Sequence, residues 1–253
     1  MILVMSGTEE GREIVRELYD SGRDVLTTVA TEYGYEVYEK MGLGHLCLAG
    51  RLDEEALSEL LKEKNIFTLI DATHPYATQA SLNAIEASKK CEVRYIRFQR
   101  SGHPIPDQTF VHFVESVNDA VEWCVTSDKK RILLTTGFSH VKDFMKLSGG
   151  REIFVRILPM ASHIEQCIEM GIPSSNILAL QGPFSLELNR AVFNQYRIDV
   201  VITKDSGKTG GVPEKIQAAG ETGIDVVVIK RSELEYPEEC STIDEVFSIL
   251  GLR

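Results

Sequence analysis

Short apolar runs alternate with amphipathic stretches along most of the chain. In the first hundred residues these runs lie at 2–5, 24–30, 46–49, 66–70 and 93–98. Runs of β-branched and other apolar residues are typical of parallel strands that are covered on both faces. One stretch between them carries Leu57, Leu60 and Leu61, a spacing that predicts a helix with one buried face. The alternation therefore predicts a parallel sheet whose strands are joined by right-handed helical crossovers.

The same alternation returns in the second half, where strands are expected at 132–135, 153–158, 177–180, 199–203 and 225–230. Between residues 99 and 109 the pattern breaks, and two prolines and a glycine stand there without periodicity. A chain of 253 residues exceeds the usual size of one domain, roughly 100 to 150 residues. We therefore predict an α/β protein with two Rossmann-like domains whose parallel sheets face an interdomain cleft. The first domain spans 1–98 and the second 99–253, with a terminal helix that can pack back on the first.

The motif Asp71-Ala72-Thr73-His74-Pro75-Tyr76-Ala77 follows the apolar run at 66–70. Its pattern indicates the end of a buried strand, a tight polar loop and the start of a helix. Pro75 suits the first helical position, where its missing N–H costs nothing. The motif therefore lies at the carboxyl end of a strand, where open α/β sheets place their ligands beside the N–H groups of the next helix.

A similar unit opens the chain, where Ser6-Gly7-Thr8-Glu9 leads into a predicted helix at 10–19. The dinucleotide-binding fingerprint has three glycines, G-x-G-x-x-G, whereas Gly7 and Gly11 stand alone here. Ser6 and Thr8 could offer hydroxyl groups to a phosphate at the helix N-terminus. The alternative is a plain strand-to-helix turn that one of these hydroxyls caps.

Three loops of the second half share this design. They contain Gly137, the segment 181–185 that starts at Gln181, and Lys204-Asp205-Ser206-Gly207-Lys208-Thr209-Gly210-Gly211. Two lysines and three glycines ahead of a helix that starts at Pro213 favour anion binding in the last loop. The alternatives are a solvent loop and a weak surface pair of Lys204 with Asp205. Because such loops share one edge of a parallel sheet, we expect all of them to line the interdomain cleft.

Composition and charge narrow the classes of partner. With 43% apolar and 26% charged residues the chain is an ordinary globular protein. Its 27 basic and 38 acidic residues give a net charge of −11, which repels nucleic acid and anionic membranes. An acidic substrate would thus need a local cluster of Arg and Lys.

Targeting, redox and metal signals are weak. The apolar start, Met1-Ile2-Leu3-Val4-Met5, lacks a basic leader and predicts a strand, so we expect a cytoplasmic protein. The five cysteines are far apart and include no Cys-x-x-Cys pair, and the six histidines show no metal-ligand spacing. We therefore expect reduced thiols and no metal bound by the protein.

Three motifs together resemble those of the precorrin-6A reductases of corrin biosynthesis. They are the heptapeptide 71–77, Gln181-Gly182-Pro183-Phe184-Ser185 with Asn189, and Lys204-Asp205-Ser206-Gly207. The resemblance spans nearly the whole chain, although relatives more often have a glycine where Ser6 stands. It implies that hydride from a nicotinamide cofactor reduces one ring double bond of precorrin-6A or of its cobalt complex, giving the 6B form on the way to cobalamin.

The implied chemistry gives roles to the candidate residues. Hydride transfer needs aligned reactants and no nucleophile, but a proton must also arrive, and Asp71 and His74 are the candidate donors. Each has a structural alternative, since His74 could cap the helix and Asp71 could brace the loop. The substrate carries many carboxylates, so a basic cluster is expected near the cleft from Arg94, Arg97, Arg100, Lys204 and Lys208. The expected substrate-binding residues are Arg97, Gln181, Lys204, Asp205, Ser206 and Lys208.

The cofactor is expected to contact Gly7, Thr8, Thr31, Arg51, Thr73, His74 and Gly137. Glu32 stands near where an acidic residue would bind the ribose 2′-hydroxyl of NADH. Arg51 could instead pair with the 2′-phosphate of NADPH. The resemblance implies NADPH for many members and NADH for some, and we favour NADPH with NADH as the alternative.

Two rival classes remain open. One is a non-catalytic NAD(P)H or metabolite sensor with a two-domain cleft, which would show no turnover. The other is a different Rossmann enzyme of the kind that carries Tyr-x-x-x-Lys, but no tyrosine of this chain has a lysine at that spacing. The expected partners are thus the tetrapyrrole substrate and other enzymes of the corrin pathway, with no nucleic acid and no membrane.

Overall fold

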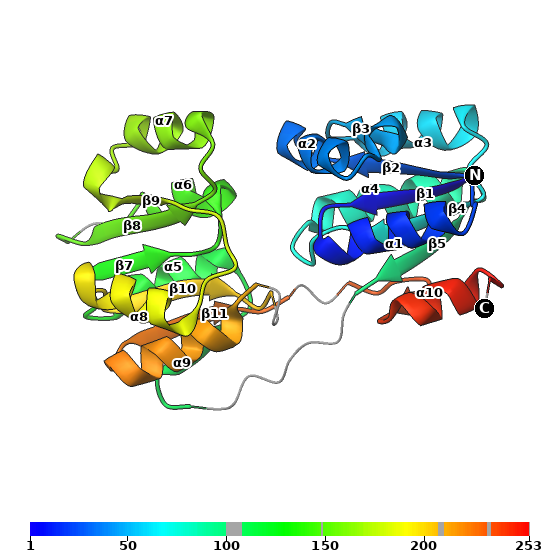
Figure 1. Cartoon of the computed structure of the whole chain (residues 1–253). Helices are drawn as coiled ribbons and strands as arrows, with labels where there is room; N and C mark the ends of the chain where they lie inside the picture. The colour runs from blue at the N-terminus through cyan, green and yellow to red at the C-terminus, as the bar shows by residue number, and fades with distance from the viewer. Residues whose placement is uncertain (100–107, 148, 207–209, 232–233, 253) are drawn as a thin grey trace. The chain divides into compact units, whose positions relative to one another are not determined.

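The chain folds into two compact units (Figure 1). The structure is a computed structural model, and it describes residues 1–99, 108–147, 149–206, 210–231 and 234–252. Unit 1 comprises Met1–Ser101 and Ser232–Arg253, and unit 2 comprises Gly102–Arg231. The sequence predicted a boundary between residues 98 and 99. In that prediction the C-terminal segment belonged to the second domain, and its terminal helix could pack back on the first. The interdomain cleft stays a prediction.

Unit 1 is built on six parallel strands in the order β12-β5-β4-β1-β2-β3. Their bounds are β1 Ile2–Ser6, β2 Val25–Val29, β3 Cys47–Ala49, β4 Thr68–Ala72, β5 Arg94–Phe98 and β12 Glu239–Cys240. The first five strands have the order 3-2-1-4-5, which is that of a dinucleotide-binding Rossmann sheet. The C-terminal segment supplies the strand in the sixth place.

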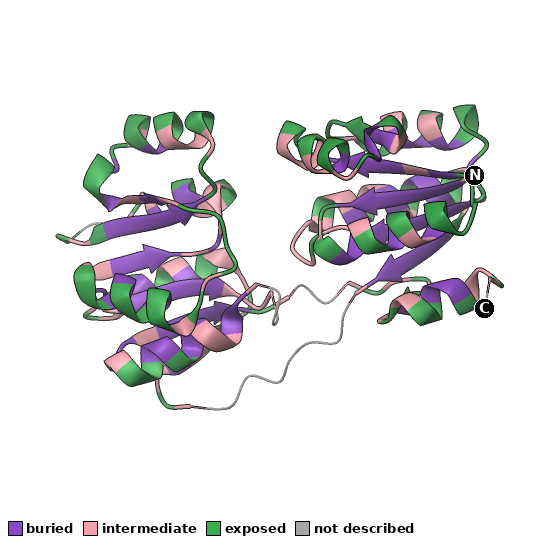
Figure 2. Cartoon of the chain, viewed as in Figure 1, coloured by how far each residue is buried: buried purple, intermediate pink, exposed green. Residues whose placement is uncertain are grey.

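Helices cover both faces of this sheet. Their bounds are α1 Glu9–Asp20, α2 Glu32–Lys40, α3 Glu54–Glu63, α4 Thr78–Lys90 and α10 Ile243–Ile249, with a short 3₁₀ turn at Gly44–Leu46. Apolar residues of α1, α2 and α10 pack in one core cluster, including Ile14, Tyr38 and Phe247. Those of α3 and α4 pack in another, including Leu57 and Ala84. Figure 2 shows the strands mostly buried and the helices buried along one side.

Unit 2 repeats the plan with six parallel strands in the order β6-β11-β10-β7-β8-β9. The strands are β6 Val111–Val114, β7 Arg131–Leu134, β8 Glu152–Ile157, β9 Ile177–Ala179, β10 Val200–Lys204 and β11 Asp225–Ile229. The helices are α5 Val117–Thr126, α6 Val141–Phe144, α7 Ala161–Glu169, α8 Leu186–Gln195 and α9 Val212–Thr222, with 3₁₀ turns at Phe138–His140 and Ser174–Asn176. If β7 is counted as the first strand and β11 as the fifth, their order is again 3-2-1-4-5. Strand β6 is the sixth strand of the sheet and pairs with β11. The α/β class with two parallel sheets is therefore confirmed.

Several elements were missed or misplaced by the sequence reasoning. Helix α2 occupies a stretch that was expected to be irregular. Gly34 allows this helix to lie close to Val29, because a Cβ added at Gly34 would be only 2.9 Å from the Cβ of Val29. The prediction also lacked β6, α5 and the two-residue strand β12. In the described part of the chain, no helix is long and apolar enough to cross a membrane.

Candidate cofactor and substrate sites

The strand order of unit 1 reverses between β1 and β4, so the loops after these strands flank a switch point, the usual ligand crevice of such sheets. Thr8 ties the two loops together. Its Oγ1 donates to the carbonyl oxygen of Ala72 at 3.1 Å and accepts from the N–H of Gly11 at 3.1 Å. A Cβ added at Gly7 would lie 3.9 Å from the backbone nitrogen of His74. The expected cofactor residues Gly7, Thr8, Thr73 and His74 therefore come from adjacent loops.

Gly11 permits α1 to start close against the sheet. A Cβ at this position would lie 2.8 Å from Ser6 Oγ and 3.2 Å from Ala72 Cβ. This is the role of the third glycine of the dinucleotide fingerprint, close packing of helix on strand. Thr8 is the N-cap of α1, and Glu9 and Glu10 lie in its first turn. Gly11 thus matches the third glycine position of the fingerprint, whereas Ser6 and Thr8 stand at the first and second.

Asp71 lies at the centre of a buried polar network at the end of β4, and its exposed fraction is 0%. Its Oδ1 accepts from the N–H of Thr73 at 3.0 Å and from Thr73 Oγ1 at 2.6 Å. Its Oδ2 accepts from Ser81 Oγ at 2.6 Å and from Tyr95 Oη at 2.8 Å. Burial, followed by the charge of Asp71, raises the pKa of Tyr95, so this phenol stays a donor. Both oxygens of Asp71 are thus engaged inside the fold.

Arg97, on β5, is the ionic partner of Asp71, with 2.8 Å between Nη1 and Oδ1. It is 1% exposed. Its Nη2 also donates to the carbonyl oxygen of Thr73 at 3.1 Å, and its guanidinium carbon lies 5.3 Å from the centre of the Tyr236 ring. The pairing with Asp71 argues against the expectation that Arg97 binds a substrate carboxylate, because its charge is already neutralised inside the fold. The pair instead fixes the conformation of the loop at Thr73.

His74 is exposed and lies in the turn between β4 and α4. Its Nδ1 accepts from the N–H of Tyr76 at 3.3 Å. Helix α4 begins at Thr78, with Ala77 as its N-cap, so the prediction that Pro75 occupies the first helical position is wrong. The loop between β4 and α4 is therefore longer than expected.

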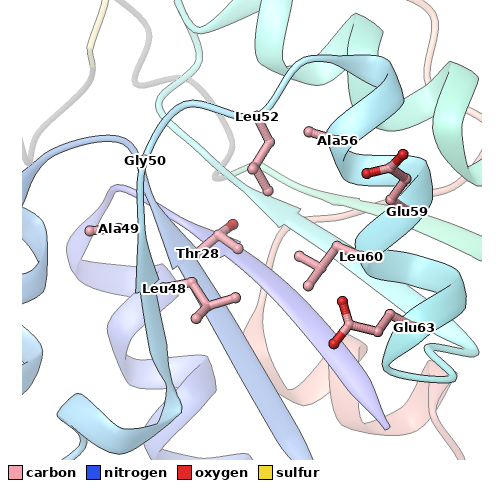
Figure 3. Close-up of a pocket in the computed structure, with 9 residues that line it drawn as sticks. All are labelled: Thr28, Leu48, Ala49, Gly50, Leu52, Ala56, Glu59, Leu60 and Glu63. Carbon is pink, nitrogen blue, oxygen red and sulfur yellow. The ribbon is translucent and has the colours of Figure 1, made fainter.

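Thr31 and Arg51 follow β2 and β3 on the other side of the switch point. Thr31 is exposed and caps α2, its Oγ1 accepting from the N–H of Gly34 at 3.1 Å. Arg51 is exposed in the turn after β3. Beside this turn is a groove of about 190 Å³ (Figure 3), lined by Thr28, Leu48, Ala49, Gly50, Leu52, Ala56, Glu59, Leu60 and Glu63. The volume is below the ~300 Å³ of an ordinary ligand pocket, so the groove alone cannot enclose a dinucleotide.

Unit 2 has its own switch point, between β7 and β10. The N–H and Oγ1 of Thr135 both donate to the carbonyl oxygen of Ile202 at 2.9 Å, which joins the ends of these strands. Gly137 follows with φ of 86°, a left-handed conformation that favours glycine. Lys204 ends β10. The structure therefore brings Gly137 and Lys204 to the same edge, while Gln181 follows the outer strand β9.

The residues after β10 carry polar groups in half-buried positions. Burial lowers the pKa of Lys204 to about 8, and burial together with the charge of Lys204 lowers the pKa of His140. Asp205 Oδ2 lies 3.8 Å from Arg231 Nε, while its buried Oδ1 has no hydrogen-bond partner among the described residues. Ser206 Oγ donates to the carbonyl oxygen of Lys204 at 3.5 Å. Lys208 lies outside the described residues.

Two buried cations near this edge escaped the sequence reasoning. Arg156 on β8 and Lys215 on α9 are 6% and 5% exposed. Each interrupts an apolar pattern with a charge, and that interruption is the signal that could have found them. Among the described residues, no group of three or more His, Cys, Asp and Glu side chains could hold a metal ion.

The chain is similar to known proteins over nearly its whole length. The family model described as Precorrin-6x reductase CbiJ/CobK matches residues 1–251. A cobalt-precorrin-6A reductase of Methanothermobacter thermautotrophicus is 38% identical, covering 98% of this chain and 84% of its own, and one of Priestia megaterium is 35% identical, covering 99% and 98%. The solved structure of a CobK precorrin-6A reductase matches with a TM-score of 0.80 at 23% identity, covering 99% of this chain and 96% of its own, which supports the fold. The chain therefore belongs to the precorrin-6x reductase family.

Proposed function

We propose that this protein uses NADPH to reduce a ring double bond of precorrin-6A or of its cobalt complex, as a step of cobalamin biosynthesis. Membership of the family makes it an oxidoreductase of corrin biosynthesis. The observation that carries the reaction is the family match, which runs through both units and so includes both switch points. The curated relatives with the higher identities are named for the cobalt-containing substrate.

The cofactor is assigned to the switch point of unit 1. The close start of α1 against Ser6, which only a glycine at position 11 allows, supports a pyrophosphate at the N–H groups of this helix. Gly7 and Thr8 would hold it from one side, and Thr73 and His74 from the other. When bound, the cofactor supplies the hydride. Gly137 lies in unit 2, and its contact with the cofactor stays a prediction.

The buried network around Asp71 changes the role that we assign to this residue. A proton donor must reach the reacting atoms, whereas Asp71 is buried with both oxygens engaged. We assign Asp71 and Arg97 to positioning of Thr73 and His74. His74 is exposed and remains the candidate donor in unit 1. Lys204, whose pKa lies near 8, is a second candidate on the substrate side.

Substrate carboxylates are assigned to the edge of unit 2 that bears Lys204, Asp205, Ser206 and Gln181. A half-buried lysine on an acidic protein suits a carboxylate, because desolvation strengthens a charge-assisted hydrogen bond. The neighbouring Asp205 Oδ1 has no partner in the described residues, and it could accept from a pyrrole N–H or a bridging water. The expected contact of Lys208 with the substrate stays a prediction.

Arg51→Ala tests the choice of nicotinamide. If Arg51 pairs with the 2′-phosphate, the change should weaken NADPH by about 1.5 kcal/mol, the low end for a hydrogen bond to a charged group, because Arg51 is exposed. NADH should be almost unaffected. Steady-state kinetics with both cofactors would measure this, with Arg23→Ala, another exposed arginine of unit 1, as the control. Equal losses of affinity for NADPH and NADH would mean that Arg51 has a structural role. A wild type that prefers NADH would indicate that Glu32 binds the ribose 2′-hydroxyl.

The reaction itself is tested by anaerobic incubation with precorrin-6A or its cobalt complex and reduced nicotinamide. Reduction shortens the conjugation of the macrocycle, so its absorbance should change as NADPH is consumed. No change with either substrate and either cofactor would remove the reductase proposal. Binding of NADPH without turnover would instead support the sensor alternative.

A further inference from the structure

Arg156 and Lys215 form a pair of buried cations in unit 2. Arg156 Nη1 donates to Asn189 Oδ1 at 2.8 Å, and its guanidinium carbon lies 4.2 Å from the centre of the Phe184 ring. Lys215 Nζ donates to Thr203 Oγ1 at 3.0 Å. Both side chains are more than nine-tenths buried. Each cation therefore meets neutral partners where a counter-ion would be expected.

Neither cation forms an ion pair with a carboxylate of the described residues. Unit 1 provides the contrast, because its buried Arg97 lies 2.8 Å from the buried Asp71. A buried charge without its partner costs several kcal/mol. Burial lowers the pKa of Arg156 to about 10, and burial with the charge of Arg156 lowers that of Lys215 to about 7. The site is thus positive and under-compensated in a protein whose net charge is −11.

The pair lies at the switch point of unit 2. In the sheet register Leu134 stands beside Val155 and beside Ile202. One position further on, Arg156, Thr135 and Thr203 therefore share a row across β8, β7 and β10, on the face that carries Phe154, Leu133 and Val201. Lys215 reaches this row from the first turn of α9, and Lys204 follows Thr203 directly. Arg156 thus lies near the carboxyl end of β8, next to β7, and Lys215 reaches the end of β10, while β7 and β10 themselves flank the crevice.

The other charged groups near Lys215 do not neutralise the pair. Glu214 precedes it on α9 and raises its pKa, but less than burial and Arg156 lower it. Glu214 Oε2 is buried and has no hydrogen-bond partner in the part of the chain that the structure describes. Lys204 on β10 adds a third cation to this edge. A carboxylate placed among these groups would supply the missing counter-charge.

We propose that Arg156 and Lys215 form an anion subsite that binds one peripheral carboxylate of the substrate. The proposal rests on the proposed tetrapyrrole substrate and adds a recognition element to it. Among the described contacts, Arg156 donates one hydrogen bond to Asn189. Other N–H groups of its planar guanidinium can therefore donate to a carboxylate. Phe184 stacks on the guanidinium and holds it in place. Neighbouring Lys204 would hold a second carboxylate or supply a proton.

The test measures proton uptake when the substrate binds. Isothermal titration of the intact protein with cobalt-precorrin-6A at pH 8, in two buffers of different ionisation enthalpy, gives the number of protons taken up. Lys215 is mostly neutral in the free protein at this pH, and a bound carboxylate raises its pKa, so about one proton should enter with the substrate. At pH 6 the lysine is already protonated and the uptake should disappear. This comparison needs no variant.

Lys215→Met keeps the apolar stem and removes the charge. We expect it to weaken the substrate Kd at least about tenfold and to reduce the uptake at pH 8 by about one proton. Lys204→Met shows how much of the proton uptake occurs at Lys204. The matched control is Lys142→Met, because Lys142 is an exposed lysine on α6. Lys215→Arg should bind the substrate but take up no proton at this position.

The outcomes separate this inference from the function on which it rests. A wild type that reduces the substrate while Lys215→Met keeps its affinity and its proton uptake would overturn the subsite. A wild type that shows no uptake at pH 8 would overturn it as well. A wild type that binds no tetrapyrrole would overturn the proposed function and the subsite together.

Discussion

Replacing Arg97 by Met is expected to lower the free energy of unfolding of unit 1 by about 3 to 5 kcal/mol, the usual cost of leaving one partner of a buried ion pair alone. Asp71 would remain at 0% exposure with its charge uncompensated. The loop at Thr73 would also lose the donor that reaches its carbonyl oxygen. Urea unfolding followed by circular dichroism measures the loss, and KM for the cofactor should rise because Thr73 and His74 are released.

Arg94→Met is the matched control for this experiment. Arg94 lies two residues earlier on β5 and pairs with Glu238 at 2.8 Å, but both side chains are substantially exposed, at 47% and 32%. Exposed pairs contribute roughly 0 to 1 kcal/mol, so the control should unfold nearly as the wild type does. Equal and small losses for the two variants would mean that solvent reaches Asp71 and that the network does not brace the loop.

The second large effect is expected for Lys204→Met. As a carboxylate anchor Lys204 should contribute about 1.5 to 3 kcal/mol to substrate binding. This corresponds to a loss of roughly 10- to 150-fold in kcat/KM for the tetrapyrrole. KM for NADPH should be unchanged, since the cofactor is assigned to unit 1. Lys142→Met, on the exposed side of α6, is the control.

The pH dependence gives an independent test of Lys204. Burial lowers its pKa to about 8, so the amine is charged below this pH and becomes neutral above it. Substrate carboxylates are ionised throughout this range. We therefore expect kcat/KM of the wild type to fall as the pH rises above about 8. Lys204→Arg should remove the part of this fall that lies near pH 8, because guanidinium stays charged, and should leave the part near pH 7 that we assign to Lys215. A wild-type profile that is flat from pH 7 to 9 would contradict the assignment.

Residues of the candidate sites differ in how far the sequence revealed them. Gly7, Thr8, Thr73 and His74 were expected because strand-loop-helix units are local, and the parallel order places their loops side by side. Arg97 was expected at a substrate carboxylate, and its partner Asp71 was expected to donate a proton. Their pairing joins residues 26 positions apart, and only the alignment of β4 with β5 brings them together. Arg156 and Lys215 lie even further apart in the sequence and were missed.

The sequence by itself determined the α/β class and most strands, because buried parallel strands must be apolar on both faces and their helices on one. It also determined the family, since the motifs at 71–77, 181–185 and 204–207 are contiguous in the chain. The tertiary structure alone decided the sixth strand of each sheet, β12 and β6, because edge pairing depends on backbone groups that any short segment can offer. The tertiary structure alone also decided which charged side chains are buried and which residues they contact, because burial is a property of the packed fold. For that reason we assign Asp71 to bracing its loop and propose Arg156 and Lys215 as a subsite.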